Sequence, residues 1–349
     1  MYIAFKTGSI SMKTKVMVIG FGFMGQTHAG SLLKTQDAEL AAIVDPVDPK
    51  ERLQSITGNR ATERISPDEI GSIPHFPNLD EALSASCADA AVIALPTKLH
   101  HDSVIQCLKA GLHVMVEKPL SISLADCERM VLTAGETNKL LAVGYVVRWM
   151  KEYQFLKQTI DSGRLGKLKY LKLSRITGIP NWGNWNDPEF IRASGGSLFD
   201  LVSHDIDFAR FCLGEPERIE SAKNLGRDQF KMISSVMRFR DADAAVEGGF
   251  VTPAGYPFRR TFAAYFENGT LFSSESGKVT EYRKNEDAVE HDFRPDNPYF
   301  TEIEDFIRAV RSGDASPVCS GSDALGTIKC CTQIAQEIGF PIPEKKEQN

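Results

Sequence analysis

The feature that most restricts the fold of this chain is a glycine-rich turn between a strand and a helix. Gly20, Gly22 and Gly25 form the pattern G-x-G-x-x-G, which follows an apolar, β-branched run at 15–19 and opens a helical pattern at about 24–33. In this setting Gly20 allows a tight turn, Gly22 lets a pyrophosphate approach the backbone, and Gly25 lets the helix press on the strand. The turn therefore predicts a dinucleotide-binding unit. Its predicted loop contacts are Gly20, Phe21, Gly22, Phe23, Met24 and Gly25.

An acidic residue ends the next predicted strand and bears on which dinucleotide is bound. Asp45 follows the apolar run 40–44 and stands twenty residues beyond the last glycine of the turn. A carboxylate at this place accepts hydrogen bonds from the ribose hydroxyls, and it repels a 2′-phosphate. An NADP enzyme usually has an arginine next to it, whereas Asp45 is followed by Pro46 and Val47, and the nearest bases are Lys50 and Arg52. We therefore predict NAD rather than NADP.

Strands and helices alternate through the first third of the chain. Further apolar runs lie at 90–95, 113–116 and 140–145, with helical patterns at 99–110 and 123–136 between them. Nearly continuous apolar strands in β-α-β order are typical of a parallel sheet covered by helices on both faces. The polar stretch 58–77 is expected to be a loop insertion.

The pattern changes after a predicted helix at 152–162. A long strand is predicted at 167–177 and a helix at 197–213, and the region from 218 to 291 contains only strand patterns. Asn268-Gly269 lies between two of these strands and predicts a type I′ hairpin turn. Two helical patterns, at 299–311 and 322–338, end the chain.

These patterns predict two domains, which agrees with a length of 349 residues. The fold class is α/β. We expect a Rossmann domain with a doubly wound parallel sheet at 12–147, which binds NAD. An α+β domain with a large, mostly antiparallel open sheet is expected at 148–340, with the C-terminal helices packing back on the first domain. The second domain is expected to bind substrate and to form the oligomer.

Composition excludes several other classes of partner. The net charge of −6 gives no basic surface for nucleic acid or an anionic membrane. No apolar run approaches the ~18 residues of a membrane helix. The seven cysteines form no C-x-x-C pair, so they are interpreted as reduced thiols in a cytoplasmic protein.

Candidate catalytic residues come from both predicted domains. Lys118 follows the strand 113–116, so it should lie at the carboxyl edge of the sheet, where ligands bind. Asp200 and His204 are four residues apart in the predicted helix and should share one face, where the carboxylate can orient the imidazole as a general base. Asp207 is as well suited to a structural hydrogen bond. A metal site of Asp200, His204 and Asp207 is an incomplete ligand set, so we predict no metal.

A tryptophan-rich segment precedes these residues. Trp182 and Trp185 are flanked by asparagines. Aromatic faces beside amides suit a polyhydroxylated ring, and a packed loop is an equally good interpretation.

Taken together, the motifs resemble those of the glucose–fructose oxidoreductase and inositol dehydrogenase family (Gfo/Idh/MocA), over about 13–340. The resemblance is carried by the glycine turn with His28 close behind, by the run 96–100, by Glu117-Lys118-Pro119, and by Gly195-Gly196 leading to Asp200 and His204. Thr97 and the pair Val146-Val147 depart from the polar residues that this family often has, while Arg148 is retained.

The resemblance implies that Lys118, Asp200 and His204 form a catalytic triad. It also implies oligomers formed through the second sheet, here expected as a homodimer or homotetramer. We expect further cofactor contacts and three substrate contacts, the latter to a small polyhydroxylated molecule. The cofactor contacts are Leu95, Pro96, Thr97, His100, Glu117 and Lys118, and the substrate contacts are Trp182, Trp185 and Arg148.

The predicted function is hydride transfer between NAD and a secondary alcohol of a sugar, a sugar derivative or an inositol-like cyclitol. Two alternatives have the same fold: a redox-neutral, NAD-dependent glycosidase and a non-catalytic NAD-sensing regulator.

Overall fold

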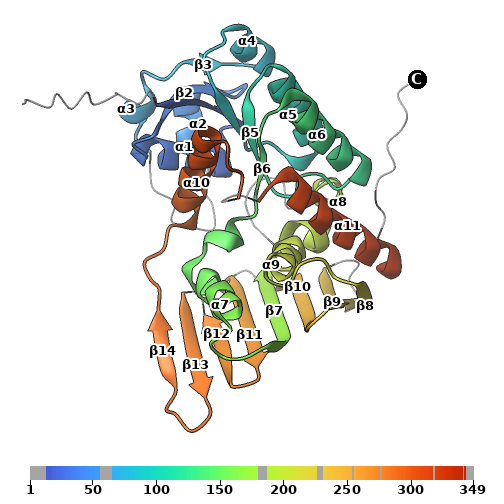
Figure 1. Cartoon of the computed structure of the whole chain (residues 1–349). Coiled ribbons are helices and arrows are strands. Elements are labelled where there is room, and N and C mark those ends of the chain that lie inside the picture. Colours follow the sequence, from blue (N-terminus) through green and yellow to red (C-terminus); the bar gives the residue numbers. More distant parts are fainter. Residues whose placement is uncertain are drawn as a thin grey trace, which may run out of the picture.

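The structure is a computed structural model. It describes residues 13–55, 65–179, 187–225, 231–253, 255–275, 277–316, 319–340 and 342. The chain forms two sheets with helices between and around them (Figure 1).

The first sheet has six parallel strands in the order β3-β2-β1-β4-β5-β6. The strands are β1 (Thr14–Ile19), β2 (Ala38–Val44), β3 (His75–Phe76), β4 (Ala90–Ile93), β5 (His113–Glu117) and β6 (Leu141–Gly144). This order reverses between β1 and β4, as in a doubly wound fold that binds ligands at the carboxyl edge. The predicted Rossmann sheet is confirmed.

Helices cover both faces of the first sheet because side chains alternate along its central strand. Met17 and Ile19 of β1 join a core that includes residues of α5 and α6, whereas Val16 and Val18 join a second core with α1. α10, from the end of the chain, packs on α1 and contributes to this second core. The helices around this sheet are α1 (Phe23–Lys34), α2 (Pro49–Ser55), α3 (Pro67–Ile70), α4 (Leu79–Ser84), α5 (His100–Lys109), α6 (Leu124–Thr137) and α10 (Pro298–Ser312), with the 3₁₀ turns η1 (Thr97–Leu99) and η2 (Val146–Trp149).

The second sheet has eight strands in the order β14-β13-β12-β11-β7-β10-β9-β8, and only β7 and β10 pair in parallel. This mostly antiparallel sheet was predicted and is confirmed. The strands are β7 (Leu168–Gly178), β8 (Arg218–Leu225), β9 (Met232–Arg238), β10 (Asp243–Thr252), β11 (Arg259–Phe266), β12 (Gly269–Glu275), β13 (Lys278–Arg283) and β14 (Val289–Asp292).

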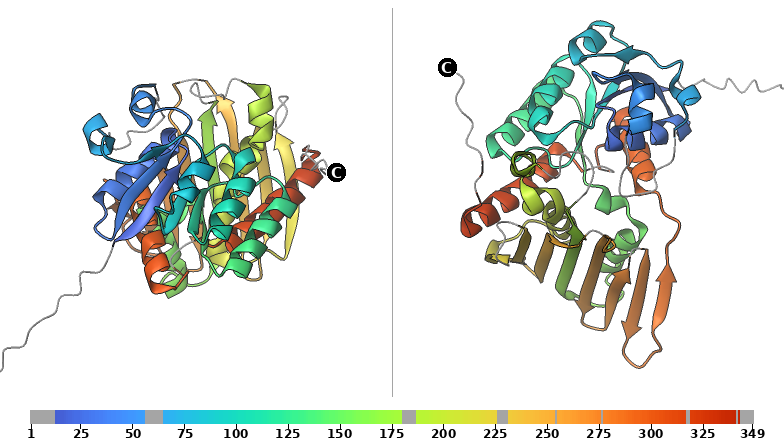
Figure 2. Two further views of the ribbon diagram at one scale, coloured as in Figure 1. Left: turned by 90° about the horizontal axis from the view of Figure 1, so that it is seen from above. Right: turned by 180° about the vertical axis from the view of Figure 1, so that it is seen from behind.

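Helices lie between this sheet and the first one, and the opposite face of the sheet is open in the described part of the chain (Figures 1 and 2). Tyr153 of α7 and Phe208 of α9 belong to the core between these helices and the sheet. Their rings meet edge-to-face, with 4.9 Å between the ring centroids. The remaining elements are α7 (Lys151–Ser162), α8 (Pro188–Ala193), the π-helical turn η3 (Leu198–Val202), α9 (Ser203–Leu213) and α11 (Gly321–Ile338).

Local structure departs from the sequence predictions in three places. The hairpin between β11 and β12 exists, but Asn268 and Gly269 are not among the residues with positive φ, so the predicted type I′ turn is wrong. The reason is tertiary: the backbone N–H groups of Glu267 and Asn268 donate to the carbonyls of Lys167 and Leu165, so the turn is bonded to the segment that leads into β7.

The stretch 58–77 was predicted to be a loop, and its described part contains α3 and β3. A capping box at Ser66 and Glu69 starts α3. The predicted helix 197–213 is interrupted by η3, so its first turn is π-helical.

Candidate active site

The glycine turn has the geometry that a bound pyrophosphate needs. Gly20 has φ +86°, and a Cβ there would lie 2.7 Å from the carbonyl oxygen of Ala94. A Cβ on Gly25 would overlap the carbonyl oxygen of Gly20. In contrast, a Cβ on Gly22, the N-cap residue of α1, would meet no described atom within 4 Å. The turn therefore packs tightly on the protein side and leaves open space beside Gly22, at the N-terminus of α1, which fits a dinucleotide.

Asp45 ties this turn to the second strand. Its Oδ2 accepts a hydrogen bond from the backbone N–H of Phe21 at 2.8 Å, and its Oδ1 accepts from the N–H of Val47 at 2.9 Å. The Nε of Arg52, from α2, donates to the same Oδ1 at 2.9 Å. The sequence indicated no arginine beside Asp45, and the fold of α2 brings one there.

The ends of β4 and β5 are joined by His100. Its ring is buried, with Nε2 2.8 Å from the carbonyl oxygen of Leu95 and Nδ1 3.0 Å from that of Pro119. Burial lowers the pKa of His100. The ring contacts two backbone carbonyls, so the structure supports a role in fixing this edge of the sheet and gives no support to the predicted contact with the cofactor.

A buried pair joins α1 to the end of β5. His28 Nε2 lies 2.7 Å from Oε1 of Glu117, and Oε2 of Glu117 accepts from the backbone N–H of Lys118 at 3.2 Å. Sequence reasoning assigned no role to His28. His28 stands three residues after Gly25, on the same side of the first helix, and this spacing was the sequence signal that could have placed it beside the glycine turn.

Lys118 and Asp200 make direct contact across the two parts of the chain. The Nζ of Lys118 donates to Oδ1 of Asp200 at 2.8 Å and to its backbone carbonyl at 2.9 Å. Both side chains are about a fifth exposed, at 18% and 20%. Asp200 lies in the π-helical turn η3, and such turns are frequent at functional sites. The cis peptide Lys118–Pro119 follows β5 directly.

His204 lies in the first turn of α9, just after η3. Its side chain is 8% exposed, and its ring meets that of Tyr145 edge-to-face with 5.8 Å between centroids. The three predicted catalytic residues thus come from the end of β5 and from two consecutive turns. Of the three, the structure shows direct contact between Lys118 and Asp200.

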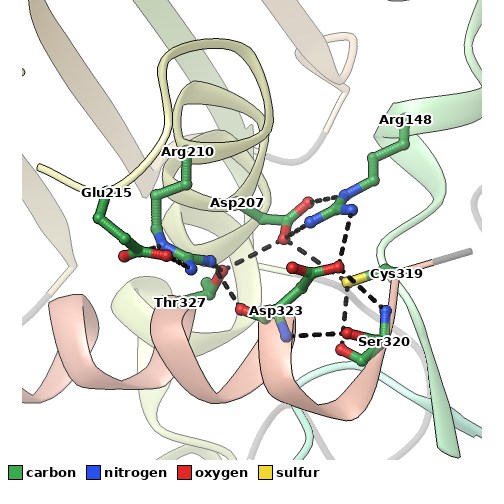
Figure 3. Close-up of polar contacts among 8 residues, drawn as sticks. All are labelled: Arg148, Asp207, Arg210, Glu215, Cys319, Ser320, Asp323 and Thr327. Carbon is green, nitrogen blue, oxygen red and sulfur yellow. Dashed lines mark hydrogen bonds and ion pairs between the residues drawn. The ribbon is translucent and has the colours of Figure 1, made fainter. Parts of the chain in front are cut away.

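α9 is fixed by a partly buried polar network (Figure 3), in which Asp207 makes the structural hydrogen bonds considered for it above, while its partners were not predicted from the sequence. The guanidinium of Arg148 donates to both carboxylate oxygens of Asp207, at 2.8 and 2.7 Å, and lies over the ring of Phe211. The predicted substrate contact of Arg148 has no support here, because a buried carboxylate binds its guanidinium. The whole network consists of Arg148, Asp207, Arg210, Glu215, Cys319, Ser320, Asp323 and Thr327.

A second buried ion pair involves Asp205, the residue after His204. The guanidinium of Arg175, on β7, donates to Asp205 at 3.2 and 2.8 Å, and both side chains are almost fully buried. Asp205 and Asp207, which follow His204 in α9, therefore anchor this helix to different elements, β7 and η2.

Trp182 and Trp185 lie outside the described residues. In the described part of the chain, no group of three or more His, Cys, Asp or Glu side chains could hold a metal ion. The described helices include none that is long and apolar enough to span a membrane.

Comparison with known proteins gives two matching family models. Residues 14–145 match a model described as "Oxidoreductase family, NAD-binding Rossmann fold", and residues 153–272 match the "GFO/IDH/MocA C-terminal domain".

Individual relatives match along most of the chain. A myo-inositol 2-dehydrogenase of Thermotoga maritima is 28% identical over 324 residues, which cover 88% of this chain and 91% of that protein. A scyllo-inositol 2-dehydrogenase (NAD(+)) of Bacillus subtilis is 28% identical over 347 residues, or 94% of each chain. The crystal structure of an oxidoreductase from Agrobacterium radiobacter, in complex with NAD+, L-tartaric acid and magnesium, is 19% identical. It has a TM-score of 0.79 and covers 94% of this chain and 97% of that one, which shows a shared fold.

Proposed function

Because this chain belongs to the Gfo/Idh/MocA family of oxidoreductases, we propose that it is an NAD-dependent dehydrogenase. Its substrate is a secondary alcohol of a sugar, a sugar derivative or an inositol-like cyclitol. The observation that carries this proposal is the contact between Lys118 and Asp200, which joins the carboxyl edge of the Rossmann sheet to the helix turn that precedes His204. The inositol dehydrogenases among its relatives support this substrate class.

In the proposed reaction the alcohol loses a hydride from carbon and a proton from oxygen. Bound NAD supplies the hydride acceptor, and the products are a ketone, NADH and a proton. His204 accepts the hydroxyl proton at its imidazole, a group whose ordinary pKa suits this task near neutral pH. Lys118 donates a hydrogen bond from Nζ to the reacting oxygen, which stabilises alkoxide character as the hydride leaves. Asp200 holds Lys118 in place and orients the base.

NAD is the cofactor we propose, with Asp45 as its ribose-binding residue. The carboxylate already holds the glycine turn through the N–H of Phe21, so the same group can link turn geometry to ribose recognition. Leu95, Pro96 and Thr97 follow β4 at the same edge, and a Cβ on Gly20 would lie 2.9 Å from Cδ2 of Leu95.

The open face of the second sheet supports the proposal of a homodimer or homotetramer. Four aromatic side chains lie on four of its eight strands, β7, β11, β12 and β13, and three of these side chains are 42–47% exposed. Strand register places them close together, because Tyr265 pairs with Tyr170 and Thr270, and Thr270 pairs with Tyr282. We name this set the aromatic patch; it consists of Tyr170, Tyr265, Phe272 and Tyr282.

We also place the protein in a reducing compartment, the cytoplasm. All seven cysteines carry free thiols, as expected in a reducing compartment.

A substrate screen tests the proposed activity. Sugars, inositols and their keto forms are incubated with the enzyme and NAD, and NADH absorbance is followed. At least one polyol should produce NADH, and its keto form should consume NADH. Release of a leaving group from glycosides without net NADH would instead indicate the redox-neutral glycosidase.

A further inference from the structure

The carboxylate of Asp45 already accepts three hydrogen bonds. Its Oδ1 receives N–H donors from Val47 and from Arg52, and its Oδ2 receives the N–H of Phe21. A carboxylate oxygen has two lone pairs, so Oδ1 is fully used and Oδ2 has one position left. The side chain is only 5% exposed. A ribose that presents both its 2′- and 3′-hydroxyls to this carboxylate must therefore displace a donor, and Arg52 is the only one of the three that is not a backbone group.

A hydrogen bond to the backbone of Arg52 also holds this residue in place. Its carbonyl oxygen accepts a hydrogen bond from Nε2 of Gln26 at 3.4 Å, and the same amide nitrogen donates to the carbonyl of Phe21 at 3.2 Å. Gln26 belongs to the first turns of α1, so α2 is attached to the glycine turn. The backbone of Asp45 is held in turn by Nε2 of His75, 2.8 Å from its carbonyl oxygen. The position of the guanidinium beside Asp45 is thus set by the fold.

The charge at this site is consequently not that of an isolated carboxylate. An acid at the end of the second strand excludes a 2′-phosphate by charge repulsion, and a nearby arginine accommodates it. Here the cation lies within hydrogen-bond distance of the acid, and about a third of its side chain, 32%, is exposed. A guanidinium binds phosphate through charge-assisted, often bidentate hydrogen bonds.

We propose that Arg52 is a specificity-determining residue that makes this chain accept a 2′-phosphorylated dinucleotide, NADP, as well as NAD. With NADP, the guanidinium keeps its place and contacts the 2′-phosphate, and the 3′-hydroxyl takes the remaining lone pair on Oδ2 of Asp45. With NAD, the ribose displaces Arg52 from Oδ1. This inference rests on the proposed dinucleotide site and extends its cofactor range.

Adenine-nucleotide fragments test this without any substrate. ADP and 2′,5′-ADP carry the part of each cofactor that reaches Asp45, and isothermal titration calorimetry measures their dissociation constants directly. The wild-type protein should bind both. Arg52→Gln should weaken 2′,5′-ADP by about 10- to 100-fold, the value of a charge-assisted contact, and should leave ADP binding unchanged or slightly tighter.

A matched control removes an equal charge elsewhere. Arg218→Gln lies on β8 in the second sheet, where Arg218 pairs with Glu220 at the surface, and it should change neither affinity. Thermal unfolding of both variants checks that they are folded.

Two results would overturn the inference about Arg52, and a third would refute the dinucleotide site as well. If the wild type binds ADP but not 2′,5′-ADP, or if Arg52→Gln weakens both ligands equally, Arg52 does not select the 2′-phosphate while the proposed NAD function stands. If the folded wild type binds neither fragment, the dinucleotide site itself is refuted.

Discussion

At the scale of single residues, the candidate site depends on side chains whose charge is partly shielded from water. Lys118 and Asp200 form a hydrogen-bonded ion pair that is about four-fifths buried. Such a pair loses most of its value if either partner is removed. The ammonium group is therefore held by Asp200 before any ligand arrives, which reduces the reorganisation needed during the reaction.

Replacement of Lys118 by methionine or of His204 by asparagine should abolish most turnover. We expect kcat to fall by about 10²- to 10⁴-fold, the usual contribution of a positioned acid or base, while the dissociation constant of NAD stays close to that of the wild type. NADH absorbance and calorimetry measure the two quantities. Lys172→Met, at an exposed site on β7, is the control. Near-normal turnover in either site variant would remove that residue from the mechanism.

Glu302 gives a pH-dependent prediction at the same scale. It lies on α10, is 2% exposed, and neither carboxyl oxygen has a hydrogen-bond partner among the described residues. Burial, and after it the charges of Glu117 and Asp207, raise the pKa of Glu302 well above its ordinary value. The folded state therefore keeps the proton that the unfolded state loses.

The stability contribution of a raised carboxyl pKa is complete below the unfolded pKa and is lost as the pH rises toward the folded pKa. Glu302→Gln should remove this loss, since an amide does not titrate. At pH values above about 5, the free energy of unfolding of the wild type should fall relative to the variant by up to about 1.4 kcal/mol per pH unit, until the pH passes the raised pKa of Glu302. Urea unfolding at each pH measures it, with Glu304→Gln on the same helix as control. Parallel curves for wild type and Glu302→Gln would contradict the prediction.

At the scale of elements, some parts of this fold follow from short-range patterns and others do not. β1, the glycine turn and α1 could be predicted because strand apolarity, the glycines and the helix period agree over one short segment. β3 has two residues, and β14 has largely exposed ones, so neither has an apolar run from which to recognise it. The turn at Asn268 has a hairpin sequence, but hydrogen bonds to the segment before β7 determine its shape.

The residues of the candidate site also differ in whether a local sequence pattern can identify them. Lys118, Asp200 and His204 were candidates because each follows a recognisable element end or spacing. The ion pairs Arg148–Asp207 and Arg175–Asp205 join residues 59 and 30 positions apart in the sequence. No local pattern encodes such a pairing, which depends on how α9 packs against η2 and β7.

The glycine turn allows packing and ligand binding to be separated experimentally. Gly25→Ala should lower both stability and NAD affinity, because its Cβ would overlap the backbone of Gly20. Gly22→Ala should leave the melting temperature nearly unchanged, since nothing described lies near its Cβ, and yet weaken NAD binding by filling the space over the turn. Differential scanning calorimetry and titration with NAD distinguish the two. A Gly22→Ala protein with wild-type affinity would show that the pyrophosphate does not lie there.

The anchoring of α9 predicts a large effect on stability. Arg148→Met leaves Asp207 charged and buried, which should cost about 3–5 kcal/mol in the free energy of unfolding. The double variant Arg148→Met/Asp207→Leu should recover much of this loss. Lys169→Met breaks an exposed pair with Glu267 and should cost no more than about 1 kcal/mol. Equal losses for the buried and the exposed variant in denaturant unfolding would refute the assignment.

At the scale of the whole molecule, the two sheets differ in how much surface they leave uncovered. Helices pack on both faces of the first sheet, whereas in the described part of the chain the second sheet has helices on one face only (Figure 2). Large exposed apolar patches on soluble domains mark interaction sites. The aromatic patch is therefore the surface through which a second copy should bind.

Charge placed in the patch should separate the copies. Tyr265→Glu combined with Phe272→Glu should shift the mass measured by sedimentation from an oligomer to a monomer, with an unchanged circular dichroism spectrum. Lys223→Glu, at an exposed position on β8, serves as the control. An unchanged oligomeric mass in the double variant would move the interface elsewhere.

The return of α10 to the first sheet has a consequence for how the protein is made. Ile303, Phe306 and Ile307 of α10 complete the core that Leu32 and Ile43 begin. The ribosome produces every strand of the first sheet early, but this cover emerges only after the whole second sheet has been synthesised. During that interval the nascent nucleotide-binding domain exposes an apolar face, and a fragment truncated after β6 would keep it exposed. An incomplete domain with an exposed apolar face is prone to aggregate, and chaperone binding would protect it until α10 has been synthesised.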